Sequence, residues 1–211
     1  MVGKRVGIKW LYSACGECIA CKRGFPNNCP KQQNTGKHVP GTLQQYMVAD
    51  ARYVSIISDG VSSEVAAPLL CAGLTMSGAL GKLKDVPEND WIVIFGSGGG
   101  LGHVGVQIAS RLDKFRVIAV DTGATKRNLS LKCGAERFVD FETEDVEAVV
   151  KDLTGEGAAA ALVVPGSEAA FALAPSLVRN MGTILTIGLP RNDFNIPLSA
   201  SLCSARSTAP S

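Results

Sequence analysis

The amino-acid sequence predicts an α/β fold, in which a doubly wound parallel sheet follows a smaller, β-rich region. From residue 91 onward, short apolar runs alternate with longer amphipathic runs, which is typical of strands joined by crossover helices. The first part, up to about residue 70, instead contains Gly, Pro and Asn clusters with short β-rich runs such as GTLQQYMVA. We therefore expect two regions of different architecture.

The composition is that of an ordinary globular protein. Its 211 residues are 46% hydrophobic and 19% charged, with a net charge of +2. Such a small charge gives no reason to expect nucleic acid or a membrane surface as a partner. No apolar stretch is expected to approach the roughly eighteen residues that cross a bilayer, and the N-terminus is a poor signal peptide. The predicted compartment is the cytosol, where thiols stay reduced.

Five strands and four helices are expected in the second region. The strands are predicted at residues 91–96, 116–121, 137–141, 159–164 and 183–188. The helices between them are predicted at residues 104–112, 126–133, 146–153 and 168–178. Because the strands are apolar throughout, both of their faces should be buried, as in a parallel sheet. The last residues, 199–211, are rich in Ser and Ala and are expected to form an irregular tail.

A cysteine-rich loop lies in the first region. Its spacing is C-x2-C-x2-C-x7-C, formed by Cys15, Cys18, Cys21 and Cys29. Four thiolates that converge on one ion are the usual ligands of structural zinc, a closed site without an open position for a substrate. Nearby basic residues (Lys22, Arg23 and Lys31) could offset the excess negative charge.

Two other interpretations of the four cysteines are less favoured than zinc. Free or disulfide-linked cysteines are disfavoured in a cytosolic protein. An iron–sulfur cluster is suggested by C-x2-C-x2-C with a later Cys-Pro, but the bacterial ferredoxin run has three residues before its last cysteine, not seven. Zinc is the preferred interpretation.

A glycine-rich run follows the strand predicted at residues 91–96. It consists of Gly96, Ser97, Gly98, Gly99, Gly100, Leu101 and Gly102. Glycines between a strand and a helix allow a tight turn, whose backbone N–H groups can approach a pyrophosphate at the helix N-terminus. The strict G-x-G-x-x-G register is not met, and such turns often only connect a strand to a helix.

Asp121, at the end of the next predicted strand, strengthens the dinucleotide interpretation. It lies nineteen residues beyond Gly102, where a carboxylate can accept hydrogen bonds from the adenosine ribose and repel a 2′-phosphate. This favours NAD over NADP as the cofactor. The alternative for Asp121 is a solvated strand end, and His103 is interpreted as a solvent-facing residue of the first helical turn.

Together these residues resemble the medium-chain, zinc-dependent alcohol dehydrogenases, closest to the fungal ethanol-type tetrameric branch. The resemblance runs from VGIKWLYSACGECIAC through AAPLLCAGLTMSGAL and WIVIFGSGGGLGHVGVQIA to EAAFALAPSLVRNMGTILTIGLP. It implies part of a GroES-like catalytic domain with a structural zinc lobe at residues 1–75, and an NAD-binding Rossmann domain at 76–198. It also implies oxidation of a small primary alcohol to an aldehyde with NAD, and a homo-oligomer.

The resemblance assigns roles to further residues. Cys71 matches a ligand of the catalytic zinc, although by itself it reads as an inert buried thiol. Lys126 matches a residue at the adenosine end of NAD, although a lysine at a helix start is normally only solvated. Trp10 matches an aromatic that narrows the substrate pocket, with a core tryptophan as the alternative. The segment that orients the nicotinamide carboxamide is matched by Ile187, Gly188 and Leu189.

The sequence also departs from the family pattern. The family's other two catalytic-zinc ligands, a cysteine and a histidine in a Gly-His-Glu signature, lie upstream of the segment matched by residue 1. Neither His38 nor His103 is followed by Glu. After Pro197 the sequence departs from the family, so the last strand of the sheet is expected to be missing and its neighbour unpaired. We expect an incomplete enzyme with little alcohol oxidation; the alternative is a non-catalytic module that binds NAD and zinc.

Overall fold

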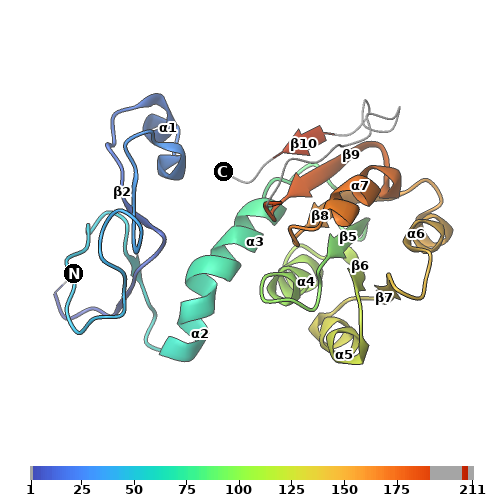
Figure 1. The fold of residues 1–211 in the computed structure, drawn as a ribbon, viewed down its shortest axis with the longest axis horizontal. Helices are drawn as coiled ribbons and strands as arrows, with labels where there is room; N and C mark the ends of the chain where they lie inside the picture. The colour runs from blue at the N-terminus through green and yellow to red at the C-terminus, as the bar shows by residue number, and fades with distance from the viewer. Residues whose placement is uncertain (1, 191–205, 209–211) are drawn as a thin grey trace. The chain divides into compact units, whose positions relative to one another are not determined.

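A computed structural model of the protein describes residues 2–190 and the backbone of residues 206–208, and it separates into two units between Leu74 and Thr75 (Figure 1). The first unit holds the cysteine-rich loop, and the second holds the parallel sheet. The sequence had placed this division one residue later.

The first unit contains short elements and little buried apolar surface. Its strands form two antiparallel pairs, β1 with β4 and β2 with β3. Among the residues that the structure describes, its buried hydrophobic side chains are only Ala14, Cys29, Ala66 and Ala72. Before residue 63 its elements are β1 (Val6–Gly7), β2 (Leu11–Ser13), α1 (Ile19–Lys22), the 3-10 turn η1 (Pro26–Asn28), β3 (Gln33–Asn34) and β4 (Ser55–Ile56). A hydrophobic core of this size cannot hold the unit together by itself.

A helical run that the sequence analysis did not predict follows. It comprises α2 (Ser63–Pro68), the π-helical η2 (Leu69–Gly73) and α3 (Leu74–Leu80). The hydroxyl of Ser62 caps its start by accepting a hydrogen bond from the Val65 amide at 3.4 Å. Its Ala-, Leu- and Gly-rich sequence lacks a clear apolar stripe, which is why the periodicity did not reveal it.

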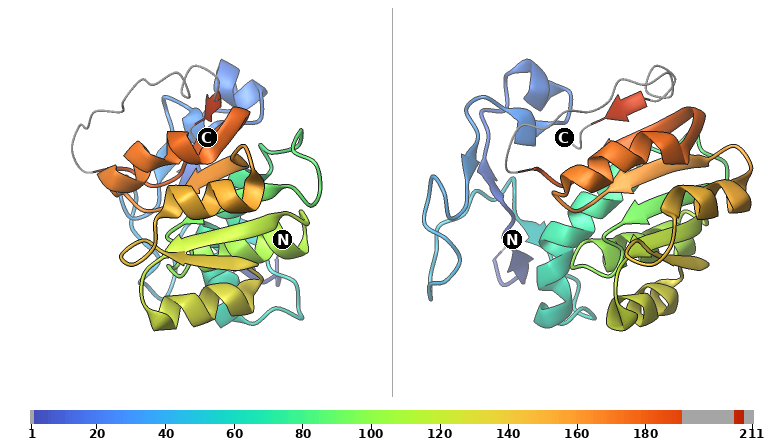
Figure 2. Two further views of the ribbon diagram at one scale, coloured as in Figure 1. Left: turned by 90° about the vertical axis from the view of Figure 1, so that its right-hand side faces the viewer. Right: turned by 45° about the vertical axis from the view of Figure 1, so that its right-hand side comes forward.

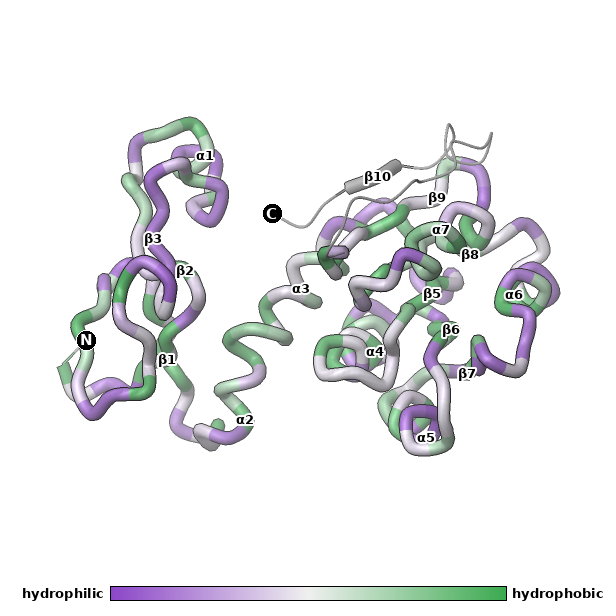
Figure 3. Tube along the Cα trace, in the orientation of Figure 1, coloured by the Kyte–Doolittle hydropathy of each residue, from purple (hydrophilic) through white to green (hydrophobic). Residues whose placement is uncertain are grey.

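This run corrects the expectation that no apolar stretch approaches the length of a membrane span. Ser63–Leu80 has eighteen residues and a mean hydropathy of 1.3, enough by length and composition alone to cross a bilayer. Figure 3 shows its hydrophobic colouring. One such helix is weak evidence, because core helices meet the same criterion, and Met76, Ala79 and Leu80 are buried in the core of the second unit.

The second unit is built on one parallel sheet with the order β10-β9-β8-β5-β6-β7. Every adjacent pair is parallel. The strands are β5 (Trp91–Phe95), β6 (Arg116–Asp121), β7 (Arg137–Asp140), β8 (Ala158–Val163), β9 (Val178–Thr186) and β10 (Arg206–Thr208). The chain order reverses direction at β5, which lies between β6 and β8, so the crevice beside β5 is the place where open α/β sheets bind ligands.

Helices cover both faces of this sheet (Figures 1 and 2). Alternate residues of a strand point to opposite faces, and β5 shows this directly: Ile92 and Ile94 join one core cluster, whereas Val93 and Phe95 join the other. The first cluster also contains side chains of α3, α4 (Gly102–Arg111) and α5 (Ala124–Cys133). The second contains side chains of α6 (Val146–Thr154) and α7 (Glu168–Leu177).

Polar contacts fix the amino-terminal edge of the sheet. The Arg179 guanidinium forms an ion pair with Asp90 at 2.6 Å, joining β9 to the residue before β5. The Arg116 guanidinium lies 3.8 Å from the centroid of the Trp91 ring and forms an ion pair with Glu136 at 2.9 Å. These contacts lie at the end of the sheet opposite the carboxyl ends of the strands.

Two expectations for the C-terminal part are corrected. First, β9 begins at Val178, directly after α7, and not at residue 183 as expected. The residues around Met181 (φ +63°) form a bulge between the strand pairings of Ala158 and Ala160, so the strand continues on both sides of it. Second, residues 206–208 are not part of an irregular tail, since they pair in parallel with residues 183–185 of β9. The edge of β9 expected to be unpaired therefore has a partner, which satisfies backbone groups that an edge strand leaves open.

Candidate functional site

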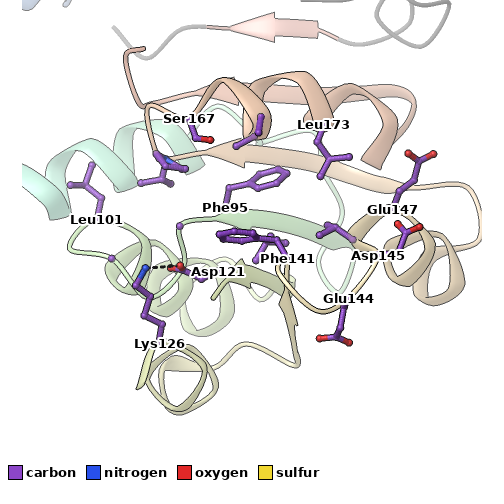
Figure 4. Close-up of a pocket in the computed structure, with 18 of the residues that line it drawn as sticks. Phe95, Leu101, Asp121, Lys126, Phe141, Glu144, Asp145, Glu147, Ser167 and Leu173 are labelled. Carbon is purple, nitrogen blue, oxygen red and sulfur yellow. Dashed lines mark hydrogen bonds and ion pairs between the residues drawn. The ribbon is translucent and has the colours of Figure 1, made fainter. Parts of the chain in front are cut away.

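A cleft of about 710 Å³ opens at the carboxyl ends of β5, β6 and β8 (Figure 4). The starts of α6 and α7 complete its walls. Its apolar lining includes Phe95, Leu101, Val120, Phe141, Pro165 and Leu173, and its polar lining includes Asp121, Lys126 and Ser167. A mainly apolar cleft with a few convergent polar groups is the usual form of a small-molecule site.

The glycine turn forms the floor between β5 and α4, and its glycines are required by close backbone contacts. Gly96 has a φ of +68°, a conformation that favours glycine. A Cβ on Gly102 would lie 2.0 Å from the Gly96 carbonyl oxygen, and one on Gly98 would lie 2.4 Å from the Lys126 Cβ. The Gly99 amide donates to the Gly96 carbonyl at 3.0 Å, which closes the turn.

Only part of the predicted glycine run faces the cleft. The lining residues from it are Gly96, Gly99, Gly100 and Leu101. Ser97 is fully buried, and its hydroxyl is 2.9 Å from that of Ser130 in α5. The Ser97 side chain is thus directed into the protein, away from any ligand in the cleft.

Asp121 ends β6 beside this turn, and its side chain is buried. One carboxylate oxygen accepts from the Gly98 amide at 2.9 Å. The other accepts from the Thr122 amide at 2.9 Å and from the Lys126 ammonium at 2.8 Å (Figure 4). With 4% of Asp121 exposed, the interpretation as a solvated strand end is wrong, and Lys126 is more than a solvated helix-start residue. Burying a carboxylate is costly unless such donors bond to it.

A second carboxylate, missed by the sequence analysis, supports the loop between β6 and α5. Asp140, the last residue of β7, accepts from the Gly123 amide at 3.1 Å. This bond and one from the Thr122 hydroxyl lower the pKa of Asp140 below its ordinary value of 3.8. Asp140 ends an apolar strand, as Asp121 does, and this shared position could have revealed it in the sequence.

The segment predicted to meet the nicotinamide follows β9. The amides of Ile187 and Gly188 both donate to the Val163 carbonyl, at 2.9 and 3.0 Å. A Cβ on Gly188 would lie 2.5 Å from the Pro165 carbonyl oxygen, so only glycine fits there. The segment is therefore held against the end of β8 next to Pro165, which lines the cleft, and Leu189 is exposed.

The four predicted cysteines converge in the first unit. Their sulfur atoms all lie within 4.8 Å of one another; Cys15 Sγ is 3.5 Å from Cys29 Sγ and 4.0 Å from Cys21 Sγ. Four sulfurs at about 2.3 Å from a tetrahedral zinc ion lie about 3.8 Å apart. The residues present therefore fit a structural zinc ion.

Backbone amides donate hydrogen bonds to two of these sulfur atoms. The Cys18 amide donates to Cys15 Sγ at 3.4 Å, and the Lys31 amide donates to Cys29 Sγ at 3.3 Å. Backbone hydrogen bonds from Glu17 and Cys18 lower the pKa of Cys15 to about 6, whereas burial raises that of Cys21 to about 12. The Arg52 guanidinium, which was not predicted, lies beside Gly16 of the cysteine loop.

Cys71 and Trp10 lie elsewhere in the first unit. Cys71 is exposed in η2, so the interpretation as a buried inert thiol is wrong. Across residues 2–190, only the quartet gathers three or more His, Cys, Asp or Glu side chains around one point, so Cys71 is not part of a three-ligand cluster there. Trp10 is 59% exposed, which rules out the core interpretation.

Two family profiles cover most of the chain. The profile described as "Zinc-binding dehydrogenase" matches residues 100–209, and that described as "Alcohol dehydrogenase GroES-like domain" matches residues 1–59. The chain belongs to the zinc-binding dehydrogenase family. The glycine turn, Asp121 and the nicotinamide segment fall in or next to the first match, and the cysteine quartet falls in the second.

Curated relatives of the chain are named alcohol dehydrogenases. It is 45% identical over 201 residues to alcohol dehydrogenase 2 of Emericella nidulans, covering 91% of the chain and 54% of that protein. It is 42% identical to an alcohol dehydrogenase of Schizosaccharomyces pombe, with 90% and 54% covered, and to one of Geobacillus stearothermophilus, with 93% and 57% covered. The chain spans little more than half the length of these relatives.

Solved structures show the same fold. The alcohol dehydrogenase of Aeropyrum pernix superposes with a TM-score of 0.85 at 28% identity, over 98% of this chain and 61% of that one. The acetophenone reductase of Geotrichum candidum, solved with NAD, gives a TM-score of 0.79 at 25% identity, over 99% and 59%. The α/β architecture predicted from the sequence is confirmed.

Proposed function

We propose that this chain carries the structural-zinc lobe and the NAD-binding unit of an alcohol dehydrogenase that oxidises small primary alcohols to aldehydes. The observation that supports it most strongly is the cleft at the switch point of the sheet, where the buried Asp121 carboxylate meets the glycine turn. In the reaction, the carbinol carbon gives a hydride to NAD and the hydroxyl loses a proton, which yields the aldehyde and NADH.

Different residues at the cleft would bind different parts of NAD. Gly96, Gly99 and Gly100 would present backbone to the pyrophosphate at the start of α4. Asp121 would accept the adenosine ribose hydroxyls and repel a 2′-phosphate, and Lys126 would lie beside the same ribose. Ile187, Gly188 and Leu189 would orient the carboxamide of the nicotinamide through their backbone. NAD is therefore the expected cofactor.

Two zinc ions belong to this proposal. The quartet Cys15, Cys18, Cys21 and Cys29 would hold the structural ion. A catalytic ion, of which Cys71 would be one ligand, supplies a Lewis acid that makes the alcohol proton easier to remove. Trp10 would narrow the substrate pocket. Because catalytic zinc needs about three protein ligands, Cys71 by itself is not expected to hold it.

The test is metal content per chain, together with NADH binding by isothermal titration calorimetry. We expect about one zinc per chain and saturable NADH binding. Metal-free protein that does not bind NADH would contradict the proposal. Two zinc ions per chain would contradict the single-ligand assignment of Cys71 and call for a search for further ligands.

A second candidate function is a non-catalytic module that binds NAD and zinc. It is favoured by Cys71, which belongs to no cluster of three or more metal-ligating side chains within residues 2–190. The assay is ethanol-dependent formation of NADH by the purified 211-residue chain. We expect none, and measurable turnover would exclude the non-catalytic module.

Location and partners follow from the same chemistry. Metal-binding thiolates persist in a reducing compartment, so the cytosol is the proposed location. A homo-oligomer is proposed from the tetrameric branch that the chain resembles, and sedimentation velocity of the metal-loaded chain tests it. Nucleic acid is not proposed as a partner, because the net charge is only +2.

A further inference from the structure

We propose that Ser130, outside the cleft, is a positioning residue for the dinucleotide. Its buried hydrogen bond to Ser97 holds the glycine turn in the conformation that receives the cofactor's phosphates. This inference rests on the proposed function, because it assumes that the cleft binds NAD.

The two hydroxyls form a fully buried polar contact. Both serines have no exposed surface, and their Oγ atoms are 2.9 Å apart although 33 residues separate them in the chain. Ser97 is in the turn after β5, and Ser130 is on α5, a different element from the helix that the turn starts. A buried hydroxyl without a partner is destabilising, so each serine fixes the place of the other.

Two further contacts tie the same turn to the same side of the protein. Gly98 packs against Lys126 of α5 so closely that a Cβ would lie 2.4 Å from the Lys126 Cβ. The Gly98 amide also donates to Asp121 at the end of β6. The residue after Ser97 is therefore held by packing and by a hydrogen bond, while Ser97 itself is held by Ser130 alone among the side chains described.

The link to ligand binding is the position of Ser97 in the turn. The turn residues Gly96, Gly99, Gly100 and Leu101 line the cleft, so a change in the backbone at Ser97 moves the part of the turn that would face phosphate. If the tether is lost, the turn occupies its binding conformation for a smaller fraction of the time. The apparent Kd then rises by the inverse of that fraction.

The competing explanation is that the pair only fills the core. In that case, loss of the hydrogen bond would lower stability without weakening the binding of pyrophosphate-containing ligands more than that of other ligands. A positioning role instead acts on the phosphates alone. ADP-ribose carries the pyrophosphate and adenosine does not, so comparing the two ligands separates the explanations.

The experiment measures both ligands by calorimetry on the full chain and on the variant Ser130→Ala. We expect ADP-ribose affinity to fall about three- to tenfold and adenosine affinity to change less than about twofold. Ser110→Ala is the matched control. The Ser110 hydroxyl, on α4 outside the glycine turn, donates to the Val106 carbonyl at 2.8 Å and also lies 3.4 Å from the Cys133 carbonyl of α5. It should leave ADP-ribose affinity unchanged.

The double variant Ser97→Ala/Ser130→Ala separates a loss of affinity from a loss of stability. Removing both hydroxyls leaves no unsatisfied group, so its Tm should equal or exceed that of either single variant, while ADP-ribose affinity stays low. The inference is overturned if wild type and Ser130→Ala bind ADP-ribose equally, or if Ser130→Ala loses as much affinity for adenosine as for ADP-ribose. Neither result would affect the proposed function. Wild-type protein that binds neither ligand overturns the proposed function and this inference with it.

Discussion

Gly102, the first residue of α4, has no room for a methyl group. A Cβ there would lie 2.0 Å from the Gly96 carbonyl oxygen and 2.7 Å from its carbon, and backbone atoms cannot move aside as a flexible side chain can. We expect Gly102→Ala to lower Tm by at least about 5 °C and to weaken NADH binding more than about tenfold. Differential scanning calorimetry and titration calorimetry measure the two effects.

Gly100, two residues earlier in the same turn, provides the control. No heavy atom lies within 4 Å of a Cβ placed there. Gly100→Ala should therefore leave Tm within about 2 °C of the wild type. If Gly100→Ala and Gly102→Ala lowered Tm equally, the close backbone approach at Gly102 would not be the reason for its glycine.

Individual residues were predictable where their chemistry is visible in the sequence. The spacing of the four cysteines predicted a site at which their sulfurs do lie within 4.8 Å. Asp121 was found because it ends an apolar strand nineteen residues beyond the glycine run, the position of a ribose-binding carboxylate. Ser130 was not, since a serine within a helix gives no sign that its partner lies 33 residues away. Such pairs depend on tertiary packing, which no local pattern records.

At the scale of elements, the loop from β6 to α5 depends on the carboxylate that ends β7. The Gly123 amide and the Thr122 hydroxyl lower the pKa of Asp140. Thr122→Val removes the hydroxyl, so we expect the pKa of Asp140 to move back up toward its ordinary value of 3.8. Carbon-13 NMR titration of the side-chain carboxyl measures this change.

The sign of the effect on stability follows from the direction of that shift. With a lowered pKa in the folded state, the unfolded state binds more protons as the pH falls, so this stability is present above about pH 3.8 and is lost below it. Thr122→Val should bring acid unfolding of the second unit to higher pH. Thr143→Val is the control, because Thr143 contacts Asp140 through its backbone amide at 3.1 Å; an equal shift there would contradict the role of the Thr122 hydroxyl.

The strands of the second unit were predictable because the sequence repeats one physical unit. Apolar runs at β5, β6 and β8 are buried almost throughout, as expected for strands covered on both faces. The helix at Ser63–Leu80 was missed because its small and apolar residues give no periodic stripe. The start of β9 was misplaced because a bulge near Met181 depends on pairing with β8, which the local sequence does not show.

For the whole molecule, the uneven distribution of buried apolar side chains predicts unequal dependence on metal. The first unit buries only Ala14, Cys29, Ala66 and Ala72 among its described hydrophobic residues, whereas the second has a core cluster on each face of its sheet. Metal binding would thus supply much of the first unit's stability. We expect zinc removal by a chelator to unfold the first unit and to leave NADH binding in place.

Limited proteolysis with mass spectrometry measures this difference. After chelation, cleavage should concentrate before residue 63, and added zinc should restore protection. Cys18→Ser should reproduce the cleavage, whereas Cys71→Ser, a change at an exposed cysteine outside the quartet, should not. Cleavage spread evenly over both units would show that the two unfold together.

The two tryptophans of the chain fall one in each unit. Trp10, 59% exposed, belongs to the unit with the cysteine quartet, and Trp91 stacks under Arg116 at the start of β5. Five strand residues place Trp91 on the order of 15 Å from the cleft, and its emission overlaps the absorption of reduced nicotinamide. Each unit thus carries its own optical reporter. In Trp91→Phe, the fluorescence of Trp10 would report metal loss. In Trp10→Phe, the fluorescence of Trp91 would report cofactor binding, and neither measurement needs an added label.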